Sequence, residues 1–258
     1  MPDKKPLILV TNDDGIHAKG LKSLVKVALE FGNVLVVAPD KPQSGMGHAV
    51  TINSILRLNK VEYSIEGVEA YSTNGTPVDC VKLAIYTALG GKKPDFLVSG
   101  VNHGSNSSIN VIYSGTMSAA VEGAVEGIPS IGFSLLDHDE NANFCPAEDI
   151  IRSMMNASLT NGIPKDTCLN VNIPKLPTDQ IKGIRVCRQA RAFWEDAFEP
   201  KKDPSGKEYY WLTGKFNNED RGEDTDEWAL ENGYVSVVPV QYDLTAHHAI
   251  STLNTWDL

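Results

Sequence analysis

The sequence predicts an α/β protein whose centre is a doubly wound, mostly parallel sheet. Short apolar runs such as Leu7–Val10 and Val34–Ala38 end in polar turns, as buried parallel strands do. Segments with apolar residues at helical spacing, such as Leu21–Ala28, separate these runs, and this alternation indicates βαβ units. The alternation stops near Pro174, so we expect a β-rich extension after that residue.

In the first two thirds of the chain, local sequence signals support each predicted helix or strand. Gly32 follows the first helical segment as a stop signal, whereas Thr76 and Pro77 supply a cap and a first helical residue. The predicted parallel strands are Leu7–Val10, Val34–Ala38, Phe96–Val98, Ile128–Phe133 and Leu169–Ile173, and the predicted helices are Leu21–Ala28, Thr76–Ile85, Ser114–Gly127 and Glu148–Thr160. Residues 50–58 and 61–65 alternate in polarity, which predicts an antiparallel hairpin at the sheet's edge.

The C-terminal third has a different character. Several prolines interrupt it, and its strand-like pieces are Gly183–Val186, Tyr209–Thr213 and Tyr234–Val238. We therefore expect residues 1–174 to form the α/β catalytic core. Residues 175–258 are expected to form a β-rich extension with hairpins and a C-terminal segment that completes the same single domain. The four tryptophans, all in this part, are expected to serve as packing or interface anchors.

Composition narrows the class of protein. The chain has 258 residues, of which 41% are hydrophobic and 22% are charged, as in an ordinary globular protein. Its net charge of −10 argues against a nucleic-acid polymer or an anionic membrane as partner, since phosphate neutralisation needs Lys and Arg. Much of the acidity lies in the extension, where Glu195–Glu231 contains twelve acidic and five basic residues. Four scattered cysteines, no N-terminal signal sequence and no long apolar run predict a cytoplasmic protein.

Two adjacent carboxylates follow the first predicted strand, in the tetrapeptide Asn12–Gly15. Ligands of open parallel sheets collect at the carboxyl ends of the strands, where Asp13 and Asp14 would lie. Because adjacent carboxylates repel each other, a divalent cation is a common means of keeping both ionised. Oxygen ligands suit Mg²⁺ or Mn²⁺. The alternative is a capped turn, in which Asn, Asp and Gly are also favoured.

Two further loops follow predicted strands and converge on the same edge. Ser44 lies in a loop after the second strand, and on its own that loop is an ordinary Pro/Gly connection. Asn102 and Asn106 lie in a long polar loop that leads to Ser114-Gly115-Thr116 at the start of a helix. A helix N-terminus with small hydroxyl residues favours an anion, and a long irregular loop in a compact domain is usually functional. The alternative is a polar loop that ends in a helix cap.

Several common motifs are absent from the sequence. It contains no Walker A loop, no GxGxxG, no G-x-S-x-G and no H-E-x-x-H. Nucleoside-triphosphate, dinucleotide, serine-hydrolase and zinc-protease sites of the usual kinds are therefore excluded.

The polar blocks resemble the SurE survival-protein family when they are taken together and in order. They are Thr11–Gly15, Ala38–Asp40 with Ser44-Gly45, Asn74–Pro77, Ser99–Asn102 and Tyr113–Thr116. The resemblance implies a Rossmann-like core with a C-terminal hairpin that reaches a neighbouring subunit, which gives a homodimer or a homotetramer. It also implies a metal-dependent phosphatase (5'-nucleotidase) that hydrolyses nucleoside 5'-monophosphates. In some members the substrates include 3'-monophosphates and polyphosphate.

The resemblance also assigns roles to individual residues. It implies one divalent cation, Mg²⁺ or Mn²⁺, on Asp13, Asp14, Ser44 and Asn102, and it implies a phosphate near Asn106 and Ser114-Gly115-Thr116. Asp13, Asp14 and Asn106 are then the expected catalytic residues. The chain departs from the family pattern at Ser108 and Asn110, where many members have Gly and Asp, and at Met46-Gly47-His48.

Two other functions remain as alternatives. One is a non-catalytic regulator that binds nucleotide or metal without turnover. The other is a nucleotide-binding transferase, for which no second substrate motif is present. Metal-dependent release of phosphate distinguishes the phosphatase from both.

Overall fold

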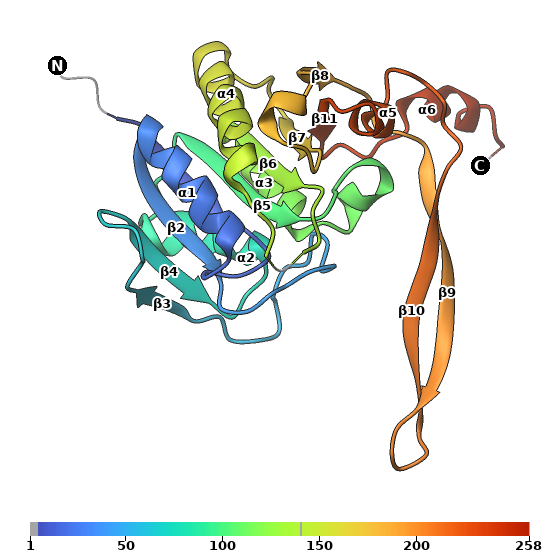
Figure 1. Cartoon of the computed structure of the whole chain (residues 1–258), viewed down its shortest axis with the longest axis horizontal. Helices are drawn as coiled ribbons and strands as arrows, with labels where there is room; N and C mark the ends of the chain where they lie inside the picture. Colours follow the sequence, from blue (N-terminus) through green and yellow to red (C-terminus); the bar gives the residue numbers. More distant parts are fainter. Residues whose placement is uncertain (1–4, 140, 258) are drawn as a thin grey trace.

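The computed structural model describes residues 5–139 and 141–257 and contains a large mixed sheet with a separate two-stranded arm (Figure 1). The large sheet has nine strands in the order β3-β4-β2-β1-β5-β6-β7-β11-β8. Neighbouring strands from β4 to β7 are parallel. The strands are β1 Leu7–Thr11, β2 Asn33–Pro39, β3 Leu58–Val61, β4 Glu69–Thr73, β5 Phe96–His103, β6 Ser130–Leu135, β7 Thr167–Ile173, β8 Ile184–Val186 and β11 Val235–Gln241. The predicted doubly wound α/β fold is confirmed.

Helices cover both faces of this sheet because alternate strand residues point to opposite sides. Ile8 and Val10 pack with α1 (Lys19–Phe31) and α4 (Cys145–Asn161) on one face. Leu9 and Leu97 pack with α2 (Pro77–Leu83) and α3 (Gly115–Val125) on the other. Shorter helical segments are the π-helix η1 Ala84–Ala88, the 3₁₀ helices η2 Ser108–Ile112 and η3 Thr178–Gln180, and the helices α5 Asp226–Glu231 and α6 His247–Leu253.

The first edge of the sheet differs from the sequence prediction. The predicted hairpin of residues 50–58 and 61–65 is wrong, because the antiparallel pair consists of β3 and β4, with Lys60 opposite Tyr71. Residues 50–57 form a loop in which Ile52 and Ile55 are exposed. Asp79 of α2 accepts hydrogen bonds from the backbone N–H and the hydroxyl of Thr51, so this loop is held to a helix instead of a strand.

The second edge contains the strands that follow residue 174. β11 pairs antiparallel with β7, and β8 pairs parallel with β11. The two segments on either side of residue 174 therefore share one sheet, although the boundary at that residue stays a prediction. Gly183–Val186 and Tyr234–Val238 were expected as isolated strand-like pieces, and both belong to this sheet.

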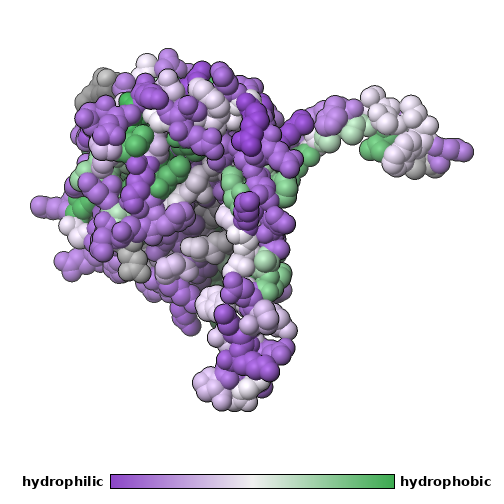
Figure 2. Space-filling model, turned by 45° about the vertical axis from the view of Figure 1, so that its right-hand side comes forward, coloured by the Kyte–Doolittle hydropathy of each residue, from purple (hydrophilic) through white to green (hydrophobic). Residues whose placement is uncertain are grey.

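The predicted hairpin extension is an arm of two long strands, β9 Ala192–Lys202 and β10 Glu208–Asn218, which pair antiparallel along their whole length. The arm projects from the body of the protein, with polar and apolar residues mixed on its surface (Figures 1 and 2). A two-stranded hairpin has only marginal stability in water, so the contacts at its base determine where it lies.

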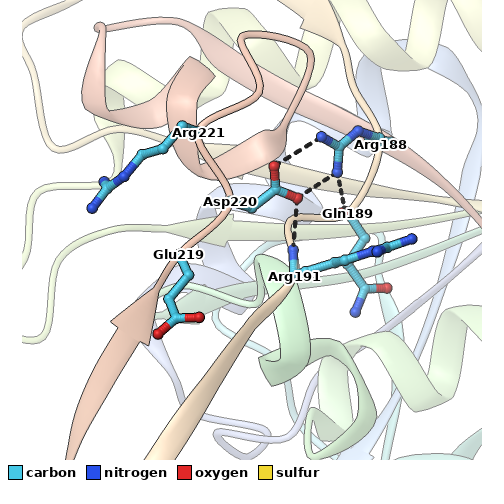
Figure 3. A pocket seen from close by; sticks show the side chains of 6 residues that line it. All are labelled: Arg188, Gln189, Arg191, Glu219, Asp220 and Arg221. Carbon is cyan, nitrogen blue, oxygen red and sulfur yellow. Dashed lines mark hydrogen bonds and ion pairs between the residues drawn. The ribbon is translucent and has the colours of Figure 1, made fainter.

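An arginine clamp joins the two ends of the arm at its base. The guanidinium of Arg188, before β9, donates two hydrogen bonds of 2.6 and 2.9 Å to the carboxylate of Asp220, after β10. The backbone N–H of Arg191 donates to the same carboxylate, as Figure 3 shows. This bidentate, charge-assisted contact holds the two ends of the arm together where they leave the body.

Candidate functional site

The loops that follow β1, β2 and β5 meet at the carboxyl edge of the sheet, as the sequence predicts for parallel neighbours. Asn12 closes the turn after β1, because its side chain bonds both the N–H and the carbonyl of Gly15. The backbone N–H of Gln43, in the loop after β2, donates to the carbonyl of Asp13 at 2.7 Å. The loop that carries Ser44 is thereby attached to the loop that carries the two carboxylates.

Asp13 is buried against the N-terminus of α3. The hydroxyl of Thr116 donates a hydrogen bond to Oδ1 of Asp13, and the backbone N–H groups of Gly115 and Thr116 also bond this carboxylate. Ser114 caps the helix, with its Oγ accepting from the N–H of Met117 at 3.0 Å. Burial raises the pKa of Asp13 above its usual value, and these donors oppose the rise.

Gly115 is required by this close approach, so Gly115→Ala is expected to displace the Asp13 carboxylate. A Cβ at residue 115 would lie 2.7 Å from Cβ and 2.9 Å from Oδ2 of Asp13. Small displacements of a reacting group are costly, and we expect any reaction that depends on this carboxylate to slow about 10- to 100-fold. Steady-state kinetics of the purified variant measure this. The matched control is Ser118→Ala, one turn later in α3, and full activity of Gly115→Ala would contradict the packing argument.

Asp14 lies beside Asp13 and has an oxygen that lacks a protein partner. Oδ2 of Asp14 is buried and makes no hydrogen bond within the described part of the chain. Burial, together with the charge of Asp13, raises the pKa of Asp14 to about 6. His103 opposes this effect through its charge and through a backbone hydrogen bond. An unpartnered carboxylate oxygen next to a second carboxylate is the arrangement that a cation stabilises.

Asn102 lies in β5, at an irregularity of its pairing with β6. The pairing of β5 with β6 shifts register between Ser99 and Asn102. The side-chain Nδ2 of Asn102 donates to the carbonyls of His103 and Gly104, at 3.0 and 2.9 Å. Its two N–H groups are thus both used, which leaves Oδ1 as the atom available to a ligand.

Ser44 is exposed, and it makes no hydrogen bond with other residues in the described ranges. Its loop is nevertheless held at two points. The N–H of Gly47 donates to the carbonyl of Tyr113, and Nε2 of His48 lies 2.9 Å from Oε2 of the buried Glu122 in α3. Glu122 also pairs with Lys82, and these partners lower its pKa although burial opposes them. His48 therefore helps to hold the loop that carries Ser44 against α3.

Asn106 is fixed by an amide network that the sequence analysis missed. Its backbone N–H donates to Oδ1 of Asn172 and its carbonyl accepts from Nδ2 of Asn170, both at 2.8 Å. Its own Nδ2 donates to Oγ of Ser134 at 2.8 Å. Asn170 and Asn172 are buried on one face of β7, and two asparagines at period two within an apolar strand were the available signal.

The residues present fit a hard divalent cation. Asp13, Asp14, Ser44 and Asn102 offer only oxygen atoms, which Mg²⁺ and Mn²⁺ prefer. Within residues 5–139 and 141–257, no group of three or more His, Cys, Asp or Glu is placed to hold a metal. The candidate site contains only two residues of these types, Asp13 and Asp14. A hydroxyl and an amide oxygen complete it, so it is consistent with that result.

The candidate phosphate-binding turn Ser114-Gly115-Thr116 lies at the same edge, directly against Asp13. The N–H groups of Gly115 and Thr116 already bond the Asp13 carboxylate. A phosphate at this turn would therefore share these donors with Asp13, and the assignment stays a prediction.

Comparisons with known proteins agree with this architecture. The family model described as survival protein SurE matches residues 8–196. The chain is similar to a protein named 5'-nucleotidase SurE in Flavobacterium psychrophilum, with 63% identity over 98% of each chain. It is similar to a protein of the same name in Flavobacterium johnsoniae, with 62% identity over 100% of this chain and 99% of the relative. The crystal structure of the SurE protein from Aquifex aeolicus matches with a TM-score of 0.83 and 39% identity, over 96% of this chain and 98% of the other. The extent of these matches shows that this chain belongs to the survival protein SurE family.

Proposed function

We propose that this chain is a metal-dependent phosphatase that hydrolyses nucleoside 5'-monophosphates to nucleoside and phosphate. The observation that carries the proposal is the adjacent Asp13 and Asp14: Asp13 is buried against the N-terminus of α3, and Oδ2 of the half-buried Asp14 is buried without a partner. The curated relatives named 5'-nucleotidase support the nucleotide substrate. Phosphate monoester hydrolysis needs positive charge near the phosphoryl oxygens, and a cation on this pair would provide it.

One divalent cation, Mg²⁺ or Mn²⁺, is proposed to bind the carboxylates of Asp13 and Asp14, the hydroxyl of Ser44 and Oδ1 of Asn102. When bound, such an ion polarises a phosphate oxygen as a Lewis acid. The loop contacts of Gln43, Gly47 and His48 would hold Ser44 near the carboxylates.

The remaining site residues would orient and stabilise the phosphoryl group. Nδ2 of Asn106 has two hydrogens, one of which Ser134 uses, so the other is available to a phosphoryl oxygen. The turn Ser114-Gly115-Thr116 adds hydroxyl and N–H donors. A water would attack phosphorus as the bond to the nucleoside oxygen breaks, with no aspartyl-phosphate intermediate. The two aspartates of the candidate site, Asp13 and Asp14, are adjacent and do not have the DxD spacing of aspartate-using phosphatases.

Further substrates and the assembly are part of the same proposal. The substrates are proposed to include 3'-monophosphates and polyphosphate. The projecting arm, with exposed Tyr209 and Trp211, suits packing against a second copy in a homodimer or homotetramer. No helix in the described ranges has the length and apolar character needed to cross a membrane. A cytoplasmic location, with neither a membrane nor a nucleic-acid polymer as partner, is likewise proposed.

Incubation of the purified protein with AMP, GMP or p-nitrophenyl phosphate, in Mg²⁺ or Mn²⁺ and then in EDTA, tests the function. We expect phosphate release that EDTA abolishes and added Mn²⁺ restores, because the paired carboxylates need the ion. Nucleotide binding without release would favour the regulator instead, and release that EDTA leaves intact would contradict the metal.

A further inference from the structure

A pocket of about 460 Å³ lies between the candidate phosphatase site and the base of the arm. Gly45 and Tyr113 line it from the body, and Trp194 and Leu212 line it from the arm. Gly45 follows Ser44, a proposed cation ligand, and Tyr113 precedes Ser114, the cap of α3. Two of its lining residues are thus sequence neighbours of residues proposed to bind the cation and the phosphate, and its volume lies in the range of about 300–1,000 Å³ that is usual for ligand sites.

The aromatic wall of this pocket is held in a fixed orientation. Nε1 of Trp194 donates to Oδ1 of Asn110 at 2.8 Å, and its ring lies 5.4 Å from that of Phe216. The indole is still 43% exposed, and Tyr113 is 53% exposed. A ring that is fixed by its polar atom and open on its apolar surface is ready to stack, because little side-chain entropy remains to be lost.

The charge of the pocket indicates which half of a nucleotide it takes. Its polar residues are Asp196 and Thr213, and the hydroxyl of Thr213 donates to the carbonyl of Ala197. No lining residue is basic, so a second phosphate group would find no positive partner and would meet the Asp196 carboxylate. An uncharged ribose and base suit these surroundings.

We propose that the pocket formed by Tyr113, Trp194 and Leu212 binds the nucleoside half of the substrate, with the base stacked on Trp194. This inference rests on the proposed phosphatase function and names the part of the molecule that gives it a preference for nucleotides. Stacking accepts every base, because each has an aromatic face, so the pocket favours nucleoside monophosphates as a class.

The arm therefore has a positioning role besides its role in assembly. The Arg188–Asp220 clamp fixes its base, and the Asn110–Trp194 bond fixes the side of the arm that faces the body. Asn110 stands where many members of the family have Asp, so this hydrogen bond uses one of the residues at which the chain departs from the family pattern.

Trp194→Ala tests the proposal, with steady-state kinetics on AMP and GMP in saturating Mn²⁺. Loss of one stacking partner is expected to raise KM about tenfold and to change kcat less than about twofold. The inhibition constant of inorganic phosphate, which has no base, is expected to stay unchanged. Trp194→Phe, which keeps an aromatic face, should recover most of the affinity, and Tyr113→Ala should raise KM as a second variant.

Trp211→Ala is the matched control, since it removes another exposed tryptophan of the same arm that does not line the pocket. Its KM for AMP is expected to equal that of the wild type, and light scattering compares the assemblies of all variants. An unchanged KM in Trp194→Ala, or an equal weakening of phosphate inhibition, would overturn the nucleoside pocket. Failure of the wild type to hydrolyse any nucleotide would instead refute the proposed function.

Discussion

Replacing Asp14 by alanine is expected to lower kcat/KM for AMP by at least about 1,000-fold. The variant removes the buried, unpartnered Oδ2 that is proposed to hold the cation, and with it half of the carboxylate charge at the site. Loss of a single electrostatic group at a phosphoryl or oxyanion site costs about 10²–10³ in rate, and loss of a cation ligand weakens the ion's whole contribution. Phosphate release measures activity, and calorimetry with Mn²⁺ measures the affinity for the ion.

The Asp14 carboxylate that is proposed to be needed for activity is expected to lower the stability of the folded protein. The pKa of Asp14 is raised to about 6 from an ordinary value of 3.8, so the folded protein holds this proton more tightly than the unfolded chain. In EDTA, stability is therefore lost as pH rises from about 4 to about 6, by about 2 kcal/mol once partial exposure is considered. Asp14→Asn removes this charge, and its metal-free melting temperature at pH 7 is expected to rise by about 5 °C.

Asp14→Asn thus separates catalysis from folding. It should be as inactive as Asp14→Ala while being more stable than the wild type, as expected when a charged site has been kept for function. Exposed Asp149, which pairs with Arg152 on α4, offers a matched control in Asp149→Asn, with activity retained. An active Asp14→Asn with normal Mn²⁺ affinity would show that the cation does not depend on this carboxylate.

The centre of the fold was predictable because each of its strands contains a short, continuous apolar run. β1, β2 and β5 are buried along most of their length, and buried strands are rich in apolar residues. Composition alone therefore predicts each of them as a parallel strand. β4, Glu-Ala-Tyr-Ser-Thr, has no such signal, and only its pairing with β2 and β3 makes it a strand. The exposed β9 contains Pro200 and several charges, so its strand character depends on β10 and on the turn that joins them.

The carboxylate pair was predictable in position but not in environment. Residues that follow β1 must lie at the carboxyl edge of a parallel sheet, which placed Asp13 and Asp14 correctly. The bond from Thr116 to Asp13 depends on α3 beginning over the end of β1, which follows from the order of strands and not from local sequence. For the same reason, the sequence analysis did not find that Asn170 and Asn172 on β7 support Asn106.

Ser108 shows how a departure from the family pattern is accommodated. It stands where many members have Gly, and its φ is +52°, in the left-handed region that glycine favours. Its N–H donates to Oδ2 of Asp226 at 2.8 Å and its hydroxyl donates to the carbonyl of Ala190 at 3.0 Å. These two buried bonds hold the serine in a conformation that its side chain disfavours. The loop after Asn106 therefore keeps its backbone conformation.

Asn106→Ala is expected to lower kcat for AMP about 300-fold while the fold is retained. The hydrogen bonds to Asn170 and Asn172 use the backbone of residue 106, so the variant keeps them and loses the side-chain amide, with its bond to Ser134 and its proposed donation to the phosphoryl oxygen. A donor that acts on the transition state accounts for about 10²–10³ in rate, whereas KM should change little because ground-state binding also uses the cation and α3. Asn161→Ala at the exposed end of α4 is the control. If Asn106→Ala instead raised KM and left kcat unchanged, Asn106 would bind substrate and transition state equally, and its amide would have no catalytic role.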